Sequence, residues 1–229
     1  MQKSFLDCLS IMTYFYIDRQ HPLILASASA RRKELLFQLQ IPFLSQESRV
    51  AEECPSDNPL QTACLLAERK AKAVGSSIEG SWILGADTIV VVPNGGMDHM
   101  VDLPAYTEVV LGKPTDEAEA RRMLCQLSGR QHRVITGFCI LDPKGRTAHV
   151  EAVTSKVDFK ALTDSELEAY IATKEPYGKA GGYAIQGIGS FLVRNIFGSY
   201  TNIVGLPLYE VITALVSIGA IKSFPLPGN

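Results

Sequence analysis

One apolar, β-rich run, WILGADTIVVV at residues 82–92, contains a single carboxylate, Asp87. The β-branched residues Ile89 to Val92 continue the strand pattern beyond it. A buried carboxylate is costly unless it is paired, protonated or bound to a metal, so Asp87 is a candidate functional acid. The alternative is that the strand ends at Gly85 and that Asp87 is an exposed turn residue.

Helical and strand signals alternate irregularly around this run. Strands are expected at 23–26, 131–141 and 147–160, and helices at 29–40 (capped by Ser27 or Ser29), Asn58 to Gly75, Thr115 to Leu127, 163–174 and from Pro207 onward. A DPKG turn joins the two long strands, which indicates a hairpin. The pattern predicts an α/β fold with a mixed sheet rather than a doubly wound parallel one. We expect an N-terminal extension at 1–22 and one domain at 23–229, with a loop insertion at 93–108.

The overall composition excludes several classes of protein. A chain of 229 residues that is 46% hydrophobic can bury a core, and its net charge of −2 gives no basic footprint for nucleic acid or an anionic membrane. Five cysteines without a C-x-x-C pair indicate neither a disulfide framework nor a zinc site, so we expect a reducing, cytoplasmic setting. The first 22 residues are interrupted by Asp7 and lack a cleavage site, which argues against a signal peptide.

Three cations, Arg31, Arg32 and Lys33, open the helix expected at 29–40. The N-terminus of a helix carries partial positive charge, so cations there are unfavourable unless an anion is bound. Arginine side chains can add charge-assisted hydrogen bonds to phosphate oxygens. The alternative is that these side chains bend into solvent or pair with Glu34.

Further polar residues could serve an anionic ligand. Lys113 in LGKP and the glycine-rich segment EPYGKAGGYAIQG, with Lys179 and Gln186, could approach a phosphate, although a solvated lysine and an ordinary loop remain the alternatives. Glu52 or Glu53 could join Asp87 on a divalent ion. The sequence has no Walker A, G-x-G-x-x-G or G-x-S-x-G motif, so P-loop, Rossmann and acyl-transfer interpretations lack support.

Taken together, six segments of the chain resemble the Maf family of nucleoside triphosphate pyrophosphatases. They are LASASARRKELL, LAERKAKAV, GADTIVV, LGKP, LSGRQHRVITG and KEPYGKAGGYAIQGIGSFLVRNIFGSYTNIVGLPLYEV, in the family's order. The KAGGYAIQG and GSYTNIVGLPLYE segments are similar to the branch that acts on dTTP and UTP. The resemblance implies a two-lobed fold of the Maf and inosine-triphosphatase group, with a central mixed sheet flanked by helices and a nucleotide cleft between the lobes.

The same resemblance implies roles for individual residues. It makes Asp87 the general base, and Arg31, Thr88 and Gln186 the determinants of substrate choice. Matched polar positions with expected substrate contacts are Ser27, Arg32, Lys70 and Lys113, and Glu52 matches an acidic position suited to a metal. Lys179 of the glycine-rich segment is also an expected substrate contact. The expected reaction converts a nucleoside triphosphate and water to the monophosphate and pyrophosphate with Mg²⁺ or Mn²⁺, held by Glu52 and Asp87. A homodimer is expected from the family alone.

Three positions depart from the family pattern. Ala30 stands where the family usually has proline, and Gly178 and Ala51 stand where it usually has aspartate. Gly178 supports an alternative interpretation, a nucleotide-binding regulator of cell division and septum formation with little turnover. Asp87, Lys113 and Gln186 favour the enzyme.

Overall fold

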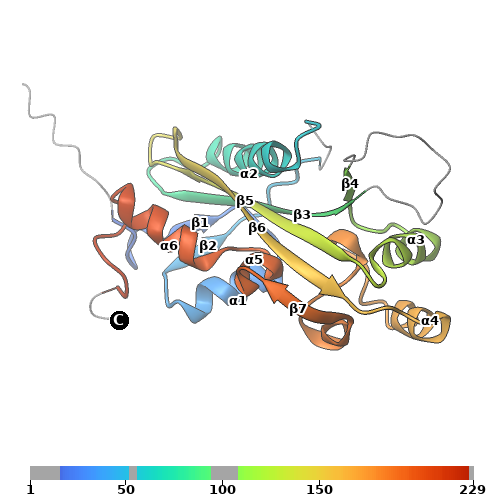
Figure 1. Ribbon diagram of the computed structural model, residues 1–229. Coiled ribbons are helices and arrows are strands. Elements are labelled where there is room, and N and C mark those ends of the chain that lie inside the picture. Colours follow the sequence, from blue (N-terminus) through green and yellow to red (C-terminus); the bar gives the residue numbers. More distant parts are fainter. Residues whose placement is uncertain (1–15, 52–55, 94–107, 227–229) are drawn as a thin grey trace, which may run out of the picture.

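The computed structural model describes residues 16–51, 56–93 and 108–226, and these form a mixed, seven-stranded sheet flanked by helices (Figure 1). The strands are β1 (Leu23–Leu25), β2 (Phe43–Ser45), β3 (Ile83–Pro93), β4 (Glu108–Leu111), β5 (Gln131–Leu141), β6 (Thr147–Phe159) and β7 (Val193–Phe197). The helices are α1 (Ala30–Gln38), α2 (Pro59–Gly75), α3 (Glu117–Leu127), α4 (Asp164–Ala172), α5 (Tyr200–Val204) and α6 (Leu208–Ser217), with 3₁₀ turns η1 (Ala180–Gly182) and η2 (Gly187–Leu192).

The sheet order is β2-β1-β3-β5-β6-β7, and β4 also pairs with β3. β1 is parallel to both β2 and β3, whereas every other pairing is antiparallel. The mixed α/β sheet expected from the sequence is therefore confirmed.

Local sequence signals account for most of the helix ends. The Ser29 side chain caps α1, Asn58 caps α2 with Pro59 in its first turn, and Thr163 and Glu166 form the capping box of α4. The prediction that Thr115 caps α3 was wrong by one residue. Asp116 is the N-cap and accepts from the Glu119 amide at 2.7 Å, while the Thr115 hydroxyl donates to the Glu119 carboxylate.

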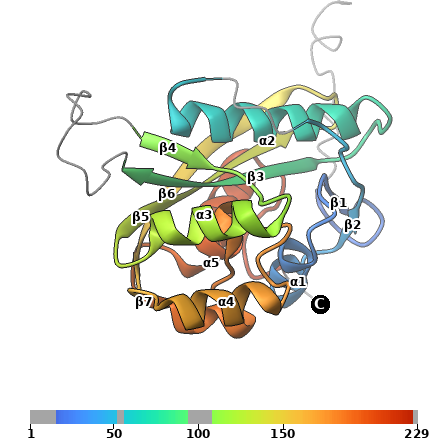
Figure 2. The same ribbon diagram turned by 90° about the vertical axis from the view of Figure 1, so that its right-hand side faces the viewer.

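Helix α2 covers one face of the sheet, and the remaining helices lie on the other face or at its ends (Figures 1 and 2). Under α2, small residues such as Ala63, Ala67 and Ala71 pack against β3 and β5. The opposite side holds two separate cores. One packs α1 and α6 around Phe138, and the other packs α3 and α4 around Tyr170.

Two glycines allow α2 to lie unusually close to the sheet. A Cβ atom on Gly85 of β3 would lie 2.3 Å from the Ala67 carbonyl oxygen, and one on Gly137 of β5 would lie 2.3 Å from the Ala63 carbonyl group. Gly137 is also the register partner of Asp87. The close approach therefore brings α2 over the segment of β3 that carries the buried acid.

The edge of β3 is only partly covered. β1 pairs with Ile83–Leu84 and β4 pairs with Val90–Pro93, on the same side of β3. Within the described part of the chain, the intervening stretch 85–89 has no strand on that side, so the end of β1, the end of β4 and Asp87 meet at one opening in the sheet.

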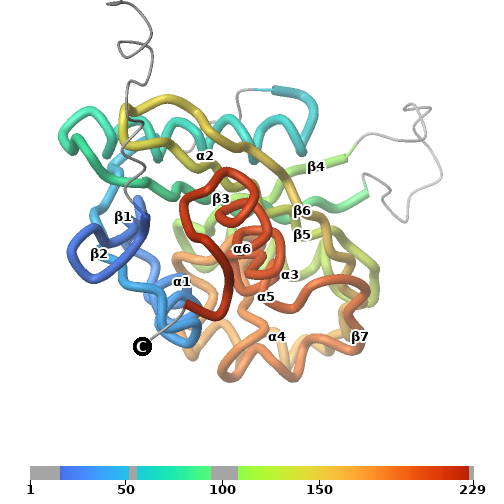
Figure 3. The backbone as a smooth tube through the Cα atoms, turned by 90° about the vertical axis from the view of Figure 1, so that its left-hand side faces the viewer, coloured from blue at the N-terminus to red at the C-terminus, as the bar shows by residue number. Residues whose placement is uncertain are grey.

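The residues just before β1 and after α6 close one end of the molecule (Figure 3). Ile17 is buried in the same core as α6, and its amide donates to the Ala220 carbonyl at 2.9 Å. Most of the expected extension at 1–22, nearly all of the expected insertion at 93–108, and Glu52 lie outside the described residues. No helix in the described part is long and apolar enough to cross a membrane.

Candidate active site

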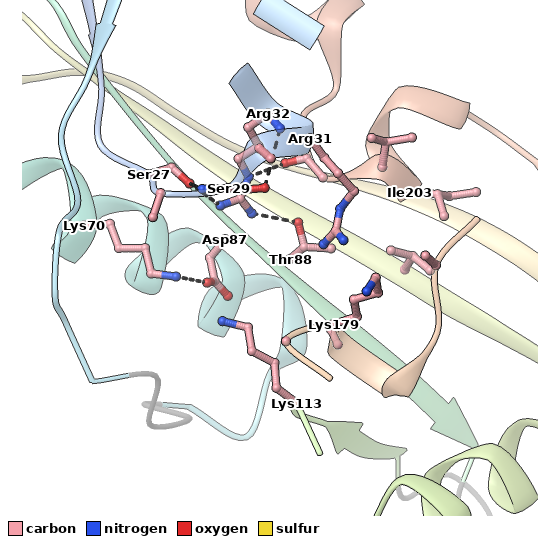
Figure 4. A pocket seen from close by; sticks show the side chains of 18 of the residues that line it. Ser27, Ser29, Arg31, Arg32, Lys70, Asp87, Thr88, Lys113, Lys179 and Ile203 are labelled. Carbon is pink, nitrogen blue, oxygen red and sulfur yellow. Dashed lines mark hydrogen bonds and ion pairs between the residues drawn. The ribbon is translucent and has the colours of Figure 1, made fainter. Parts of the chain in front are cut away.

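A cavity of about 470 Å³ opens at the uncovered edge of β3 (Figure 4). Its walls come from the start of α1, the segment 47–50, Lys70 of α2, β3, Lys113 two residues after β4, the segment 178–186 and the end of α5. All nine predicted site residues within the described ranges line it: Ser27, Arg31, Arg32, Lys70, Asp87, Thr88, Lys113, Lys179 and Gln186. Lys33 does not line it, so the three cations at the start of α1 divide into two that reach the cavity and one that does not.

Asp87 is held by a buried ion pair. The Lys70 ammonium, projecting from α2, donates to the Asp87 carboxylate at 2.5 Å, and both residues are less than a tenth exposed. The alternative that Asp87 is an exposed turn residue is therefore excluded. Successive side chains of a strand point to opposite faces, so Asp87 faces α2 while Thr88 faces the other side. The cavity reaches both because it lies at the strand edge.

Arg31 and Lys179 form a cationic wall opposite Asp87, and their side chains point towards each other (Figure 4). Burial lowers the pKa of the Arg31 guanidinium, against the opposing effect of the Glu175 carboxylate. Burial also lowers the pKa of Lys179, and the neighbouring Arg31 charge lowers it further. Two partly buried like charges are unfavourable in an empty cavity, and a bound anion would relieve their repulsion.

Arg32 differs from its neighbour because its guanidinium bonds mainly to protein. Its Nε donates to the Gly205 carbonyl at 2.7 Å, Nη1 to the Ser27 hydroxyl at 3.2 Å and Nη2 to the Thr88 hydroxyl at 3.0 Å. Because these bonds join α1, β3 and the end of α5, they favour a role for Arg32 in holding the cavity wall together.

Glu175 holds the glycine-rich segment in place, although no pattern in the sequence predicts a role for it. Its carboxylate accepts from the Ile188 amide at 3.0 Å, the Gly189 amide at 2.9 Å and the Tyr170 hydroxyl at 3.2 Å, and its backbone carbonyl accepts from the Lys179 ammonium. Lys179 and Gln186 are therefore placed on a segment that Glu175 ties down near both ends.

Other cavity residues were also not among the predicted site residues. The segment from Glu47 to Val50 lines the cavity, and Arg49 there has a φ of 40°, which is uncommon for a residue other than glycine. Ile203 and Gly205 complete the wall from the end of α5. Glu47 to Val50 lie outside the segments that carry the family resemblance, whereas Ile203 and Gly205 lie within GSYTNIVGLPLYE without a role assigned to them there.

The donors around the cavity fit one divalent ion bound together with a phosphorylated ligand. Mg²⁺ is usually held by one or two carboxylates plus substrate phosphates, and the Asp87 carboxylate lines the cavity. No group of three or more His, Cys, Asp or Glu side chains suited to a metal occurs among residues 16–51, 56–93 and 108–226. A complete all-protein metal site is thus not formed by the described residues.

Comparison with known proteins agrees with this geometry. The family model described as "Maf-like protein" matches residues 22–218. The chain is 44% identical over 210 residues to the dTTP/UTP pyrophosphatase of Syntrophotalea carbinolica, covering 90% of this chain and 89% of that one. It is 46% identical over 200 residues to the dTTP/UTP pyrophosphatase of Geobacter sp. strain M21, covering 87% and 96%.

Among solved structures, a nucleoside-triphosphatase / dITP/XTP pyrophosphatase from Mycobacterium abscessus aligns with 67% of this chain and 94% of that one, at 14% identity and a TM-score of 0.36. This likeness is too low to support an argument. The family match and the two relatives cover most of the chain, and the residues matched by the family model include every site residue described above. The chain belongs to the Maf-like protein family.

Proposed function

We propose that this protein hydrolyses dTTP and UTP to the nucleoside monophosphate and pyrophosphate. The observation that carries the proposal is the Asp87 carboxylate in the wall of a cavity whose other charged side chains are all cations apart from Glu47. The whole chain has a net charge of −2, so the excess of cations around the cavity is a local feature and does not reflect the overall charge. The relatives named dTTP/UTP pyrophosphatase support this choice of substrate.

In the proposed reaction, water attacks the α-phosphorus and the bond from that phosphorus to the α,β-bridging oxygen breaks. Asp87 orients the water and accepts its proton, while Lys70 fixes the orientation of the carboxylate. Arg31, Lys113 and Lys179 neutralise the triphosphate and align the departing pyrophosphate. Asp87 and the substrate phosphates would hold a Mg²⁺ or Mn²⁺ ion, which supplies further charge neutralisation.

A nucleotide panel tests the proposal. Purified protein is incubated with dTTP, UTP, CTP, ATP and GTP, with Mg²⁺, Mn²⁺ or EDTA, and pyrophosphate and monophosphate are measured. We expect more pyrophosphate to be released from dTTP and UTP than from the other nucleotides, and we expect this release to stop in EDTA. Binding without release by folded protein would contradict the enzyme and would instead favour the nucleotide-binding regulator. Release of inorganic phosphate in place of pyrophosphate would contradict attack at the α-phosphorus.

A further inference from the structure

The hydroxyl group of Thr88 belongs to a chain of hydrogen bonds that runs from the cavity wall into the protein. The Arg32 guanidinium donates to Thr88 Oγ1 at 3.0 Å, and Thr88 Oγ1 lies 2.9 Å from Thr136 Oγ1 on the neighbouring strand β5. Thr136 Oγ1 in turn lies 2.8 Å from the carbonyl oxygen of Asn202. Thr136 and Asn202 are completely buried, so no solvent competes for these bonds.

The positions of the protons follow from counting donors. A carbonyl oxygen carries no proton, so the proton between Thr136 and Asn202 belongs to Thr136; without it, two oxygens 2.8 Å apart would repel. A hydroxyl has one proton, so Thr136 has none left for Thr88. The 2.9 Å contact between the two threonines must therefore contain the proton of Thr88. Thr88 donates inward.

This direction limits what Thr88 can do in the cavity. Its proton is used by Thr136 and one of its two lone pairs is used by Arg32, so it can offer a ligand only the remaining lone pair. An acceptor repels a phosphate oxygen and binds an N–H or O–H group. Thr88 is therefore suited to the nucleoside part of a nucleotide, while the cations Arg31, Lys113 and Lys179 are suited to its phosphates.

We propose that Thr136 is a positioning residue for base selection, which fixes Thr88 as an acceptor for the ring N–H of uracil and thymine. Cytosine has an unprotonated acceptor nitrogen at the same ring position, and it would face the Thr88 lone pair unfavourably. This inference rests on the proposed function and extends it to a residue that does not touch the substrate.

Substitution of Thr136 tests this role. Thr136→Val keeps the shape of the side chain but removes the acceptor for the Thr88 proton, and Asn202 keeps a second donor, the Gly205 amide at 3.1 Å. Thr88 can then turn its proton towards the base. We expect the ratio of kcat/KM for UTP over CTP to fall by about tenfold or more, as for one misdirected buried hydrogen bond. Thr136→Ser, which retains the hydroxyl, should keep the wild-type ratio.

A parallel measurement separates this inference from the proposed function. The affinities of α,β-methylene UTP, its N3-methyl derivative and α,β-methylene CTP are measured by calorimetry, which requires no turnover. We expect wild type to prefer the first analogue, and Thr136→Val to lose that preference over the cytosine analogue. If the wild-type protein shows this pattern of affinities but no turnover, the proposed function is contradicted and the role of Thr136 is not.

Two results would overturn the role of Thr136. One is an equal fall of kcat/KM for UTP and CTP in Thr136→Val, so that the ratio of the two values is unchanged. That result would mean that Thr136 has a structural role only. The other is equal wild-type affinity for the UTP analogue and its N3-methyl derivative. That result would mean that Thr88 does not bind the ring N–H, and that it faces either the sugar or no group of the ligand.

Discussion

Asp87 and Lys70 are buried together, and each lowers the free-energy cost of burying the charge of the other. Their side chains meet at 2.5 Å, where the charge of one compensates the charge of the other. Removing one member of such a pair leaves an uncompensated buried charge, which typically costs about 3–5 kcal/mol. Substitutions at this pair therefore affect folding as well as catalysis, and both need to be measured.

Replacing Asp87 by asparagine should lower pyrophosphate release from UTP at least about a hundredfold, because an amide cannot accept the proton of the attacking water. Nucleotide affinity should stay within a few fold of wild type, since the cations that meet the phosphates are unchanged. Steady-state kinetics and calorimetry, with circular dichroism to confirm folding, make the comparison. Near-normal turnover would assign the base to another residue.

Arg31 and Lys33 offer a matched pair of cations two residues apart. Arg31 lines the cavity and Lys33 does not, so Arg31→Ala should raise KM for UTP about tenfold or more, while Lys33→Ala should leave it nearly unchanged. The dependence of KM on salt should also become shallower in Arg31→Ala only. Equal effects of the two substitutions would indicate that the net charge of α1, and not contact with the ligand, controls binding.

Which of these residues could be read from the sequence depends on the range of their contacts. Asp87 was identifiable because a single acid stands out within an apolar strand. Glu175 and Thr136 were not identifiable, because the two backbone amides that Glu175 binds lie 13 and 14 residues away, the partners of Thr136 lie 48 and 66 residues away, and all of them look ordinary in the sequence. The expected phosphate contact of Arg32 and the metal role of Glu52 stay predictions, as do the homodimer and the cytoplasmic location.

Among the elements, α2 has the most direct effect on the site, because it carries Lys70. Both of its ends were predictable, since Asn58, Pro59 and Gly75 are local signals. Its depth on the sheet was not predictable, because Gly85 and Gly137 act through contacts with a helix that precedes them in the chain. The ends of a helix can thus be predicted from the local sequence, whereas the distance at which it packs on the sheet cannot.

A single methyl group should test how closely α2 must lie. In Gly137→Ala the new Cβ would overlap the Ala63 carbonyl group, so we expect the free energy of unfolding to fall by at least about 2 kcal/mol. Turnover should fall as well, because Lys70 moves with the helix. Gly112→Ala is the control, since nothing lies within 4 Å of its Cβ position. Urea unfolding compares the variants, and equal stability in both would show that α2 adjusts without cost.

The glycine-rich segment depends on Glu175 in a comparable way. Glu175→Gln replaces an acceptor for two backbone amides with a group that also donates, so the segment carrying Lys179 and Gln186 should loosen. We expect KM for UTP to rise about tenfold with a smaller change in kcat. Glu168→Gln on α4, whose carboxylate pairs at the surface with Arg121, serves as the control in the same kinetic assay. A fall in kcat alone would contradict a role in binding.

For the whole molecule, stability towards acid depends on a histidine outside the cavity. His132 is 1% exposed, and its Nε2 lies 2.7 Å from the Tyr183 hydroxyl. Burial lowers the pKa of His132 to about 4, partly opposed by the Asp158 carboxylate. Since the unfolded chain takes up this proton near pH 6.5, the contribution of His132 to stability is present above that pH and is lost as the pH falls towards 4.

This linkage predicts a measurable difference between variants. Between pH 7 and pH 4, wild type should lose on the order of 3 kcal/mol more unfolding free energy than His132→Gln, which cannot take up the proton. Urea unfolding at several pH values gives the comparison, and identical pH profiles for wild type and His132→Gln would show that His132 is protonated equally in both states.

The bond from Arg32 to the Gly205 carbonyl spans 173 positions of the chain. During translation at about 5–20 residues per second, Arg32 is made roughly 10–35 seconds before its acceptor. Throughout that interval the wall formed by Arg32, Thr88 and Gly205 is incomplete. A ribosome-bound chain therefore cannot present a finished nucleotide site until Gly205 has been synthesised and has left the ribosome.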